Sequence, residues 1–219
     1  MYQTQFYYRL DKRAIEFNIP CLANLTFVSA ARTGRVAAKA RGFLRAHGIL
    51  LRRRIHVKLH GQRIPIGPSH IGLYNAETDQ IELLSYPQAR CQTADDPLFG
   101  MAMTRPLYES VVVHEVSHAI VEQNLSTRRP TSRVVHEYIA YAAQLTSMAP
   151  DLREEILRRY DQPAYADVNE MSWVYYEMDP SGFGVKVYRH FRATHDPAAF
   201  LQDLLNGAVR PAAERSEGM

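Results

Sequence analysis

Cysteine is scarce in this sequence, and long apolar runs are missing. The 219 residues include two cysteines, Cys21 and Cys91, whose separation matches no metal-binding motif. Two such cysteines define neither a disulfide framework nor a redox compartment, although they would be able to pair in an exported protein. No segment approaches the roughly 18 consecutive apolar residues of a transmembrane helix, so we predict no membrane span.

A strong excess of charge and a clear export signal are also missing. Lys and Arg number 26 against 23 Asp and Glu, a net charge of +3, and the basic residues are scattered. We interpret the densest groups, residues 52–54 and 128–133, as solvated surface and expect no nucleic-acid partner. The first residues lack the basic-then-apolar order of a signal peptide, which favours a cytoplasmic protein. The short apolar segment 21–31, more simply a strand, leaves export to the periplasm open.

The length of the chain allows one substantial hydrophobic core but not a second full domain. With 46% apolar residues, we expect a single domain over residues 1–205, with a sheet-rich part at about 1–85 and a helical part at about 106–205. In residues 206–219 glycine, proline and charge replace apolar periodicity, and we expect a flexible tail there. Oligomeric state has no signature in the sequence.

Strand signals are concentrated in the first half of the chain. A strand-like stretch at 23–29 is followed, after a helix, by residues 54–60, whose alternation of period two is typical of a half-buried strand. Two short runs at 71–74 and 80–84 flank residues 75–79, which have the composition of a turn. Together they predict a β-hairpin.

Helical signals dominate the second half. A basic, Ala-rich helix with a glycine stop is predicted at 35–47, and strong helices follow at 106–123 and 131–148, the latter with Thr131 as N-cap. Shorter helices continue to Leu205. The predicted fold class is therefore α+β, with a small mixed sheet preceding most of the helices.

The first strong helix contains the pattern His-Glu-x-x-His, formed by His114, Glu115 and His118. Residues four apart lie one above the other on a helix, so both imidazoles are able to bind one tetrahedral metal ion. Glu115 lies about 100° around the helix, from where it can reach a metal-bound water.

A carboxylate in the second strong helix extends this pattern. Glu137 lies within residues 134–143, a segment that is apolar almost all round. Burying an unpaired carboxylate costs several kcal/mol, so Glu137 needs a cation, a metal or several donors. It follows His118 by 19 positions, enough for the helix to end and a second helix to return beside it. Ala140, one turn further on, would allow the two helices to approach closely.

These paired helices resemble the gluzincin group of zinc peptidases, in which His-Glu-x-x-His is followed by a glutamate about 18 or more residues later on an antiparallel helix. The resemblance covers about residues 66–148 and extends to the hairpin, since zincins use an edge strand beside the active helix to bind an extended peptide. In size and layout the chain is similar to minimal bacterial gluzincin-like proteins. The metzincin pattern is not met, because Val121 and Asn124 occupy the positions of its glycine and third histidine.

The resemblance implies a zincin-like fold and specific roles. His114, His118 and Glu137 would be ligands of one Zn²⁺, and Glu115 would be the general base that activates water for attack on a peptide or protein substrate. A hydrogen-bond donor would also be needed to stabilise the tetrahedral oxyanion formed during hydrolysis, and the sequence does not select one. Several residues are candidates, and each has the alternative interpretation of a packing or surface residue. These candidates are Tyr138, Tyr141, Tyr175, Tyr176 and His190.

Three further residues have competing interpretations. His136 would be able to replace Glu137 as a ligand, although it points about 100° away on the helix. Glu122 is either a carboxylate that orients a ligand imidazole or an exposed charge at the helix end. Trp173 is interpreted as core rather than as part of a substrate site.

Three hypotheses about function follow. The leading one is a zinc-dependent peptidase. The second is a zinc-binding but catalytically inactive protein of the same scaffold, which acts as an interaction partner. The third is a metal-free structural domain with a chance motif, in which the two histidines would point apart.

Overall fold

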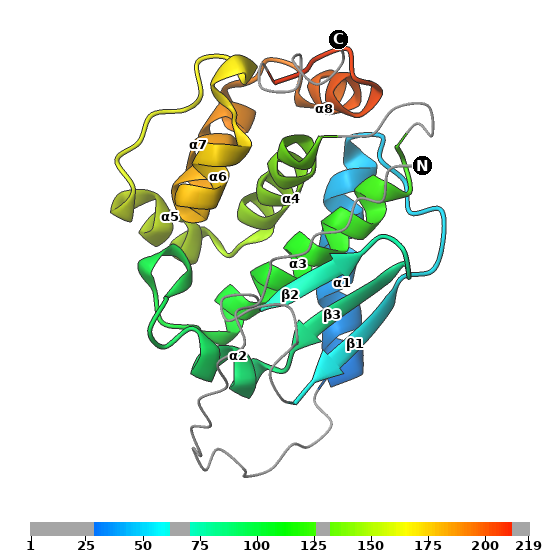
Figure 1. The fold of residues 1–219 in the computed structure, drawn as a ribbon, viewed down its shortest axis with the longest axis vertical. Helices are drawn as coiled ribbons and strands as arrows, with labels where there is room; N and C mark the ends of the chain where they lie inside the picture. The colour runs from blue at the N-terminus through cyan, green and yellow to red at the C-terminus, as the bar shows by residue number, and fades with distance from the viewer. Residues whose placement is uncertain (1–28, 62–70, 126–131, 212–219) are drawn as a thin grey trace.

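The protein has an α+β fold, with a three-stranded sheet packed against a group of helices (Figure 1). The computed structural model describes residues 29–61, 71–125 and 132–211. The α+β prediction is confirmed. In the described residues the helices, including the short 3₁₀ turns η1 and η2, are α1 (Ser29–Ala46), α2 (Tyr86–Gln92), η1 (Leu98–Gly100), α3 (Arg105–Glu122), α4 (Arg133–Ser147), α5 (Pro150–Arg159), η2 (Val168–Glu170), α6 (Trp173–Met178), α7 (Pro180–Ala193) and α8 (Pro197–Asn206).

The sheet is mixed and has the strand order β1-β3-β2. Strand β1 (His56–His60) pairs in parallel with β3 (Gln80–Leu84), and β2 (Gly72–Asn75) pairs antiparallel with β3. The predicted hairpin is confirmed as β2 and β3, and the strand predicted at 54–60 is confirmed as β1. Because β3 lies in the middle, β2 is an edge strand, and it also contacts α3.

Helix α1 confirms the predicted basic helix but begins earlier, at Ser29. Ser29 was predicted as the end of a strand-like stretch, and its helical conformation corrects that prediction; the rest of the stretch lies outside the described residues. The predicted glycine stop is confirmed, because Gly48 has φ +77°, a conformation that glycine adopts without strain. Ile49 N then donates to Leu44 O, which closes the helix end.

Helices α3 and α4 form the centre of the structure and are mostly buried. Thr104 caps α3 by accepting a hydrogen bond from Leu107 N. The N-cap of α4 is Ser132, which accepts from Val135 N, so the prediction of Thr131 was wrong by one residue. Ser132 and its neighbour Thr131 both carry the hydroxyl that this role requires, and the sequence does not distinguish them.

The segment between the sheet and α3 contains α2 and η1, which the sequence did not predict. Helix α2 is short, with a proline in its first turn, and Cys91 is exposed on it; Cys21 lies outside the described residues. In η1, Phe99 is fully buried with φ +53°. The later predicted helices are confirmed as α5 to α8, while the division into one domain and a tail stays a prediction.

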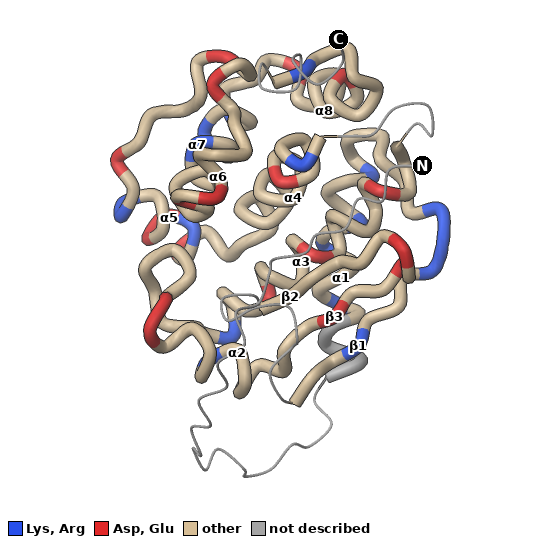
Figure 2. The backbone as a smooth tube through the Cα atoms, in the orientation of Figure 1, with Lys and Arg blue, Asp and Glu red and all other residues tan. Residues whose placement is uncertain are grey.

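Charged residues of both signs are interspersed along the described backbone (Figure 2). The basic run at 52–54 is exposed on the loop between α1 and β1, where Arg53 Nε lies 3.1 Å from Asp79 Oδ2. Among the described residues, no helix combines the length and apolar character needed to cross a membrane.

Candidate metal centre

Three predicted ligand residues converge between the two central helices. His114 and His118 come from α3 and Glu137 from α4, and one candidate ligand atom of each lies within 4.8 Å of the others. His118 Nε2 is 2.9 Å from His114 Nε2 and 3.6 Å from Glu137 Oε1, while His114 Nε2 is 3.3 Å from Glu137 Oε2. The histidines therefore point together, unlike the arrangement that a chance motif predicts.

Helix geometry and the packing of α3 against α4 account for this convergence. His114 and His118 are one turn apart on α3, so their rings share a face. Ala140 of α4, one turn from Glu137, is completely buried, and α4 packs against α3. The residue order at the interface shows that the helices run antiparallel, because Glu137 meets His118 while Gln144 meets His114.

The three side chains are nearly enclosed by protein, with 11% of His114, 13% of His118 and 11% of Glu137 exposed. Glu137 Oε2 is buried and lies 3.3 Å from His114 Nε2, but it makes no well-formed hydrogen bond with the described residues. An unsatisfied buried carboxylate oxygen costs several kcal/mol, and a cation between it and the imidazoles would remove that cost. The donor set of two imidazoles and one carboxylate therefore fits a divalent metal ion.

Without a cation, the two histidines have opposite pKa shifts. Burial lowers the pKa of His114, but the interaction with the adjacent Glu137 carboxylate outweighs burial and raises the pKa above its ordinary value. Burial, together with the charges of His114 and His136, lowers the pKa of His118 well below its ordinary value. Because a metal ligand has to be deprotonated, metal binding would compete with protonation at both rings.

A chain of hydrogen bonds leads away from His114 into the protein. His114 Nδ1 lies 3.0 Å from Gln144 Oε1, Gln144 Nε2 donates to Ser110 Oγ at 3.1 Å, and Ser110 Oγ donates to Leu107 O at 2.6 Å. The sequence reasoning missed Gln144. Its position, seven residues after Glu137, was the available signal, because residues seven apart share a helix face.

Glu115 lies against the edge strand β2. A Cβ atom added to Gly72 would be 2.7 Å from Glu115 Cγ and 2.9 Å from Glu115 Cδ, so the strand has room for this side chain only because residue 72 is glycine. The carboxylate accepts a hydrogen bond from the Tyr74 backbone. Burial raises the pKa of Glu115 to about 7, against the opposing charge of His114.

Among the described residues, no strand pairs with the outer edge of β2, and this edge presents backbone groups beside Glu115. Leu84 N donates to Ile71 O, so these two residues form a hydrogen-bonded antiparallel pair. Because hydrogen-bonded and non-hydrogen-bonded pairs alternate, the N–H and C=O groups of Gly72 and Tyr74 point away from β3. The Tyr74 N–H is bound by Glu115. The Gly72 N–H, the Gly72 C=O and the Tyr74 C=O are suited to pairing with an added strand.

Two of the five oxyanion-donor candidates lie at the centre. The ring of Tyr141 contacts the ring of His114 edge-on, with centroids 4.7 Å apart. The Tyr176 hydroxyl of α6 is hydrogen-bonded to Glu137. Burial raises the pKa of both tyrosines well above the ordinary value, so both hydroxyls stay protonated donors.

The other three candidates have partners elsewhere. The Tyr138 hydroxyl lies 2.7 Å from His190 Nδ1, and both rings pack against Phe200 of α8. Tyr175 stacks edge-on with Tyr165. These contacts favour the interpretation of Tyr138, Tyr175 and His190 as packing residues.

The remaining predicted residues lie beside the centre. His136 Nε2 faces Glu122 Oε2 at 3.6 Å, so the Glu122 carboxylate lies by His136 and not by a ring of the triad. The His136 ring is stacked at 6.0 Å from that of His118. Trp173 is half-buried and packs on Tyr176, consistent with its interpretation as core.

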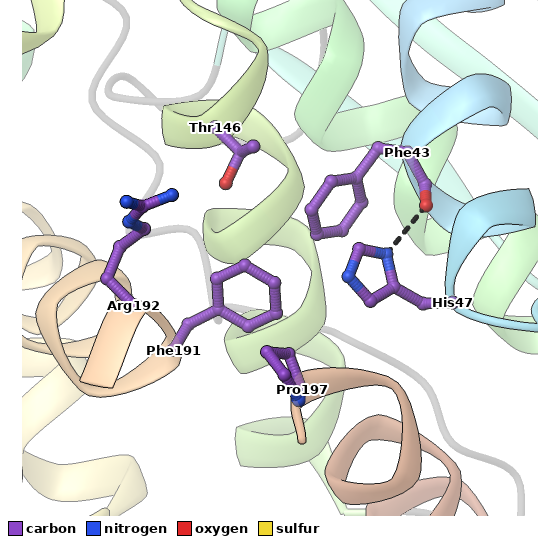
Figure 3. A pocket seen from close by; sticks show the side chains of 6 residues that line it. All are labelled: Phe43, His47, Thr146, Phe191, Arg192 and Pro197. Atoms are coloured by element: carbon purple, nitrogen blue, oxygen red, sulfur yellow. Dashed lines mark hydrogen bonds between the residues drawn. The ribbon is translucent and has the colours of Figure 1, made fainter. Parts of the chain in front are cut away.

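A cavity of about 260 Å³ lies at the C-terminal end of α4, apart from the triad (Figure 3). Two phenylalanine rings and an imidazole surround it, and His47 Nδ1 is hydrogen-bonded to Phe43 O. None of the predicted ligands lines this cavity. Its lining residues are Phe43, His47, Thr146, Phe191, Arg192 and Pro197.

Comparison with known proteins connects the chain to a family without assigning an activity. No curated protein and no solved structure matches it significantly. Residues 26–214, which include α1 to α8 and the whole triad, match a family described as "Family of unknown function (DUF6639)". The chain therefore belongs to the DUF6639 family.

Proposed function

We propose that this protein is a zinc-dependent peptidase of the gluzincin type, with a zincin-like arrangement of its sheet and central helices. The observation that carries the proposal is the convergence of His114, His118 and Glu137, with a buried carboxylate oxygen that makes no well-formed hydrogen bond with the described residues. Two imidazoles and one carboxylate are a common ligand set of catalytic zinc, which keeps a further coordination position open.

Zinc held by these residues would polarise a substrate carbonyl and make a water molecule more acidic. Glu115 would accept a proton from the attacking water as the water oxygen bonds to the carbonyl carbon. It would then give this proton to the amine nitrogen as the C–N bond breaks.

The neighbouring elements support a peptide as substrate. Strand β2 has outward-pointing backbone groups at Gly72 and Tyr74, and an extended peptide would pair as an additional strand with those that Glu115 does not bind: both groups of Gly72 and the C=O of Tyr74. Such pairing would bring the scissile carbonyl past Glu115. The Tyr176 hydroxyl, which has one proton and is hydrogen-bonded to Glu137, would have to turn from this carboxylate to the developing oxyanion to act as its donor.

One observation favours the second candidate, a zinc-binding protein without catalytic activity. Little more than a tenth of each ligand side chain is exposed, which leaves narrow access for a polypeptide. In this alternative the metal would stabilise the contact of α3 with α4, and the outer surface would bind a partner.

The experiment is to measure the zinc content of untagged protein by plasma mass spectrometry, with His118→Ala and Glu137→Ala beside the parent. We expect about one equivalent in the parent and a large loss in both variants, because each loses one of three protein ligands. A well-folded parent without metal would refute both zinc proposals.

Glu115→Gln separates the two candidates. It preserves the size of the side chain and lies outside the ligand set, so zinc content is expected to match the parent. On a library of unstructured peptides, a peptidase is expected to lose at least about a hundredfold in rate. A parent that holds zinc and cleaves no peptide supports the inactive candidate.

A further inference from the structure

We infer that Gln144 is a positioning residue that holds His114 with a proton on Nδ1, so that the lone pair of Nε2 is directed at the metal position. That His114 is a metal ligand rests on the proposed function. The proton on His114 Nδ1 is inferred independently of that function. Neither the His-Glu-x-x-His motif nor the spacing to Glu137 assigns any role to this glutamine.

The direction of the hydrogen-bond chain follows from its last member. Leu107 O is a carbonyl and only accepts, and Ser110 Oγ lies 2.6 Å from it. Two oxygen atoms so close need a proton between them, so the single hydroxyl proton of Ser110 is committed to Leu107.

The amide orientation of Gln144 is then determined. Because the Ser110 proton is already used, Ser110 Oγ accepts a hydrogen bond from the Gln144 NH₂ group at 3.1 Å. The amide oxygen must consequently face His114 Nδ1, at 3.0 Å. An amide oxygen only accepts, so Nδ1 carries the proton. Nε2, directed at Glu137 Oε2, is left as the ligand atom.

Burial makes this chain difficult to replace. Gln144 is 2% exposed and Ser110 is 4% exposed, so water has little access to take the place of either partner. A ring whose tautomer and orientation are already set loses less freedom on binding a metal. The partner of His114 is also neutral, so it adds no charge to that of Glu137 and leaves the metal more electron-deficient than a carboxylate partner would.

The first test compares zinc affinities by competition with a chromophoric chelator. Gln144→Leu is expected to weaken zinc binding by about tenfold to a hundredfold. Gln144→Glu retains an acceptor oxygen for Nδ1 and is expected to bind zinc at least as tightly as the parent. Gln123→Leu is the matched control, since Gln123 is also buried and hydrogen-bonded, to the backbone of Arg52 and Arg53. It is expected to lose stability without losing zinc affinity.

Parent-like zinc affinity in Gln144→Leu would overturn the inference, and so would an equal loss in Gln123→Leu, which would indicate a general effect of stability. If Gln144→Leu does not fold, Ser110→Ala serves instead, because it releases the Gln144 amide to rotate. The expected loss of zinc affinity is then at the tenfold end of the same range.

The second test does not require metal. In ¹⁵N-histidine-labelled protein, the Nδ1 proton of His114 is expected as a slowly exchanging NMR signal, with or without zinc, that disappears in Gln144→Leu. A parent that shows this signal but binds no zinc would refute the proposed function and leave the assignment of Gln144 standing. A signal that is absent from the parent, or unchanged in Gln144→Leu, would overturn the assignment itself.

Discussion

The contact between Glu115 and the edge strand makes Gly72→Ala an informative substitution. Its Cβ would lie 2.7 Å from Glu115 Cγ and 2.7 Å from Leu83 Cδ2, whereas carbon atoms in favourable contact are about 3.5–4.0 Å apart. Residue 72 has no left-handed φ, so alanine fits the backbone and the cost is steric. Relieving both contacts requires shifts of about 1 Å.

Overpacking of this kind costs about 1–3 kcal/mol, which corresponds to a decrease in Tm of roughly 2–12 °C for a protein of this size. If the protein is a peptidase, a general base displaced by about 1 Å would lower the rate of hydrolysis by about a hundredfold. Zinc content is expected to stay at the parent level, because the three atoms nearest to the added Cβ belong to Glu115 and Leu83 and not to a ligand. Loss of rate without loss of metal would separate this effect from damage to the triad.

The assay is calorimetric unfolding of the zinc-loaded protein, with zinc content and peptide hydrolysis measured on the same preparations. Gly42→Ala is the control, since Gly42 is exposed on α1 and an added Cβ would contact nothing within 4 Å. In a helix that change is expected to stabilise the protein by about 0.5–1 kcal/mol. A Gly72→Ala protein with the Tm and hydrolysis rate of the parent would show that Glu115 does not lie against β2.

Two other substitutions test the packing around the triad. Gly184→Ala would place a Cβ 2.6 Å from Cε1 of Tyr141, whose ring contacts His114. We expect this overpacking to lower the free energy of unfolding in urea by about 1–3 kcal/mol. An unchanged urea midpoint would contradict the contact between Gly184 and Tyr141. Burial raises the pKa of Tyr108 to about 12, and its hydroxyl donates to Leu84 O. The stabilisation by the neutral phenol is therefore complete below the unfolded value of about 10 and is lost as pH rises through about 12. Tyr108→Phe is expected to be less stable than the parent by about 1 kcal/mol at about pH 8, and this difference is expected to shrink by about pH 11. A difference in stability that is the same at both pH values would refute the raised pKa of Tyr108.

Local helix geometry explains why the triad was predictable from the sequence. The spacing of His114 and His118 places both rings on one face of any α-helix, whatever surrounds it. The apolar segment around Glu137 indicated a buried carboxylate that needs a partner. Both inferences depend on short-range patterns, and the structure brings these three residues together as predicted.

The contacts of Glu115 and Gln144 depend instead on tertiary packing. Nothing in the local sequence indicates that Gly72 leaves room for Glu115, because the two residues are 43 positions apart and meet only when β2 packs on α3. Helix α2 was missed for a related reason: a helix of seven residues is too short for a clear apolar period, and its packing against α3 supports it.

Helix α4 has two buried polar residues on one face, and they differ in whether the surrounding protein satisfies their hydrogen-bonding groups. Glu137 and Gln144 are two turns apart, both are buried, and both face histidines of α3. In a helix stabilised only by apolar packing, two polar side chains on one buried face would each cost free energy unless satisfied. Gln144 is satisfied by Ser110 and His114, whereas Glu137 retains a buried oxygen that makes no well-formed hydrogen bond with the described residues. This difference favours a cation beside Glu137 and a supporting role for Gln144, since apolar side chains at both positions would have packed α4 at lower cost.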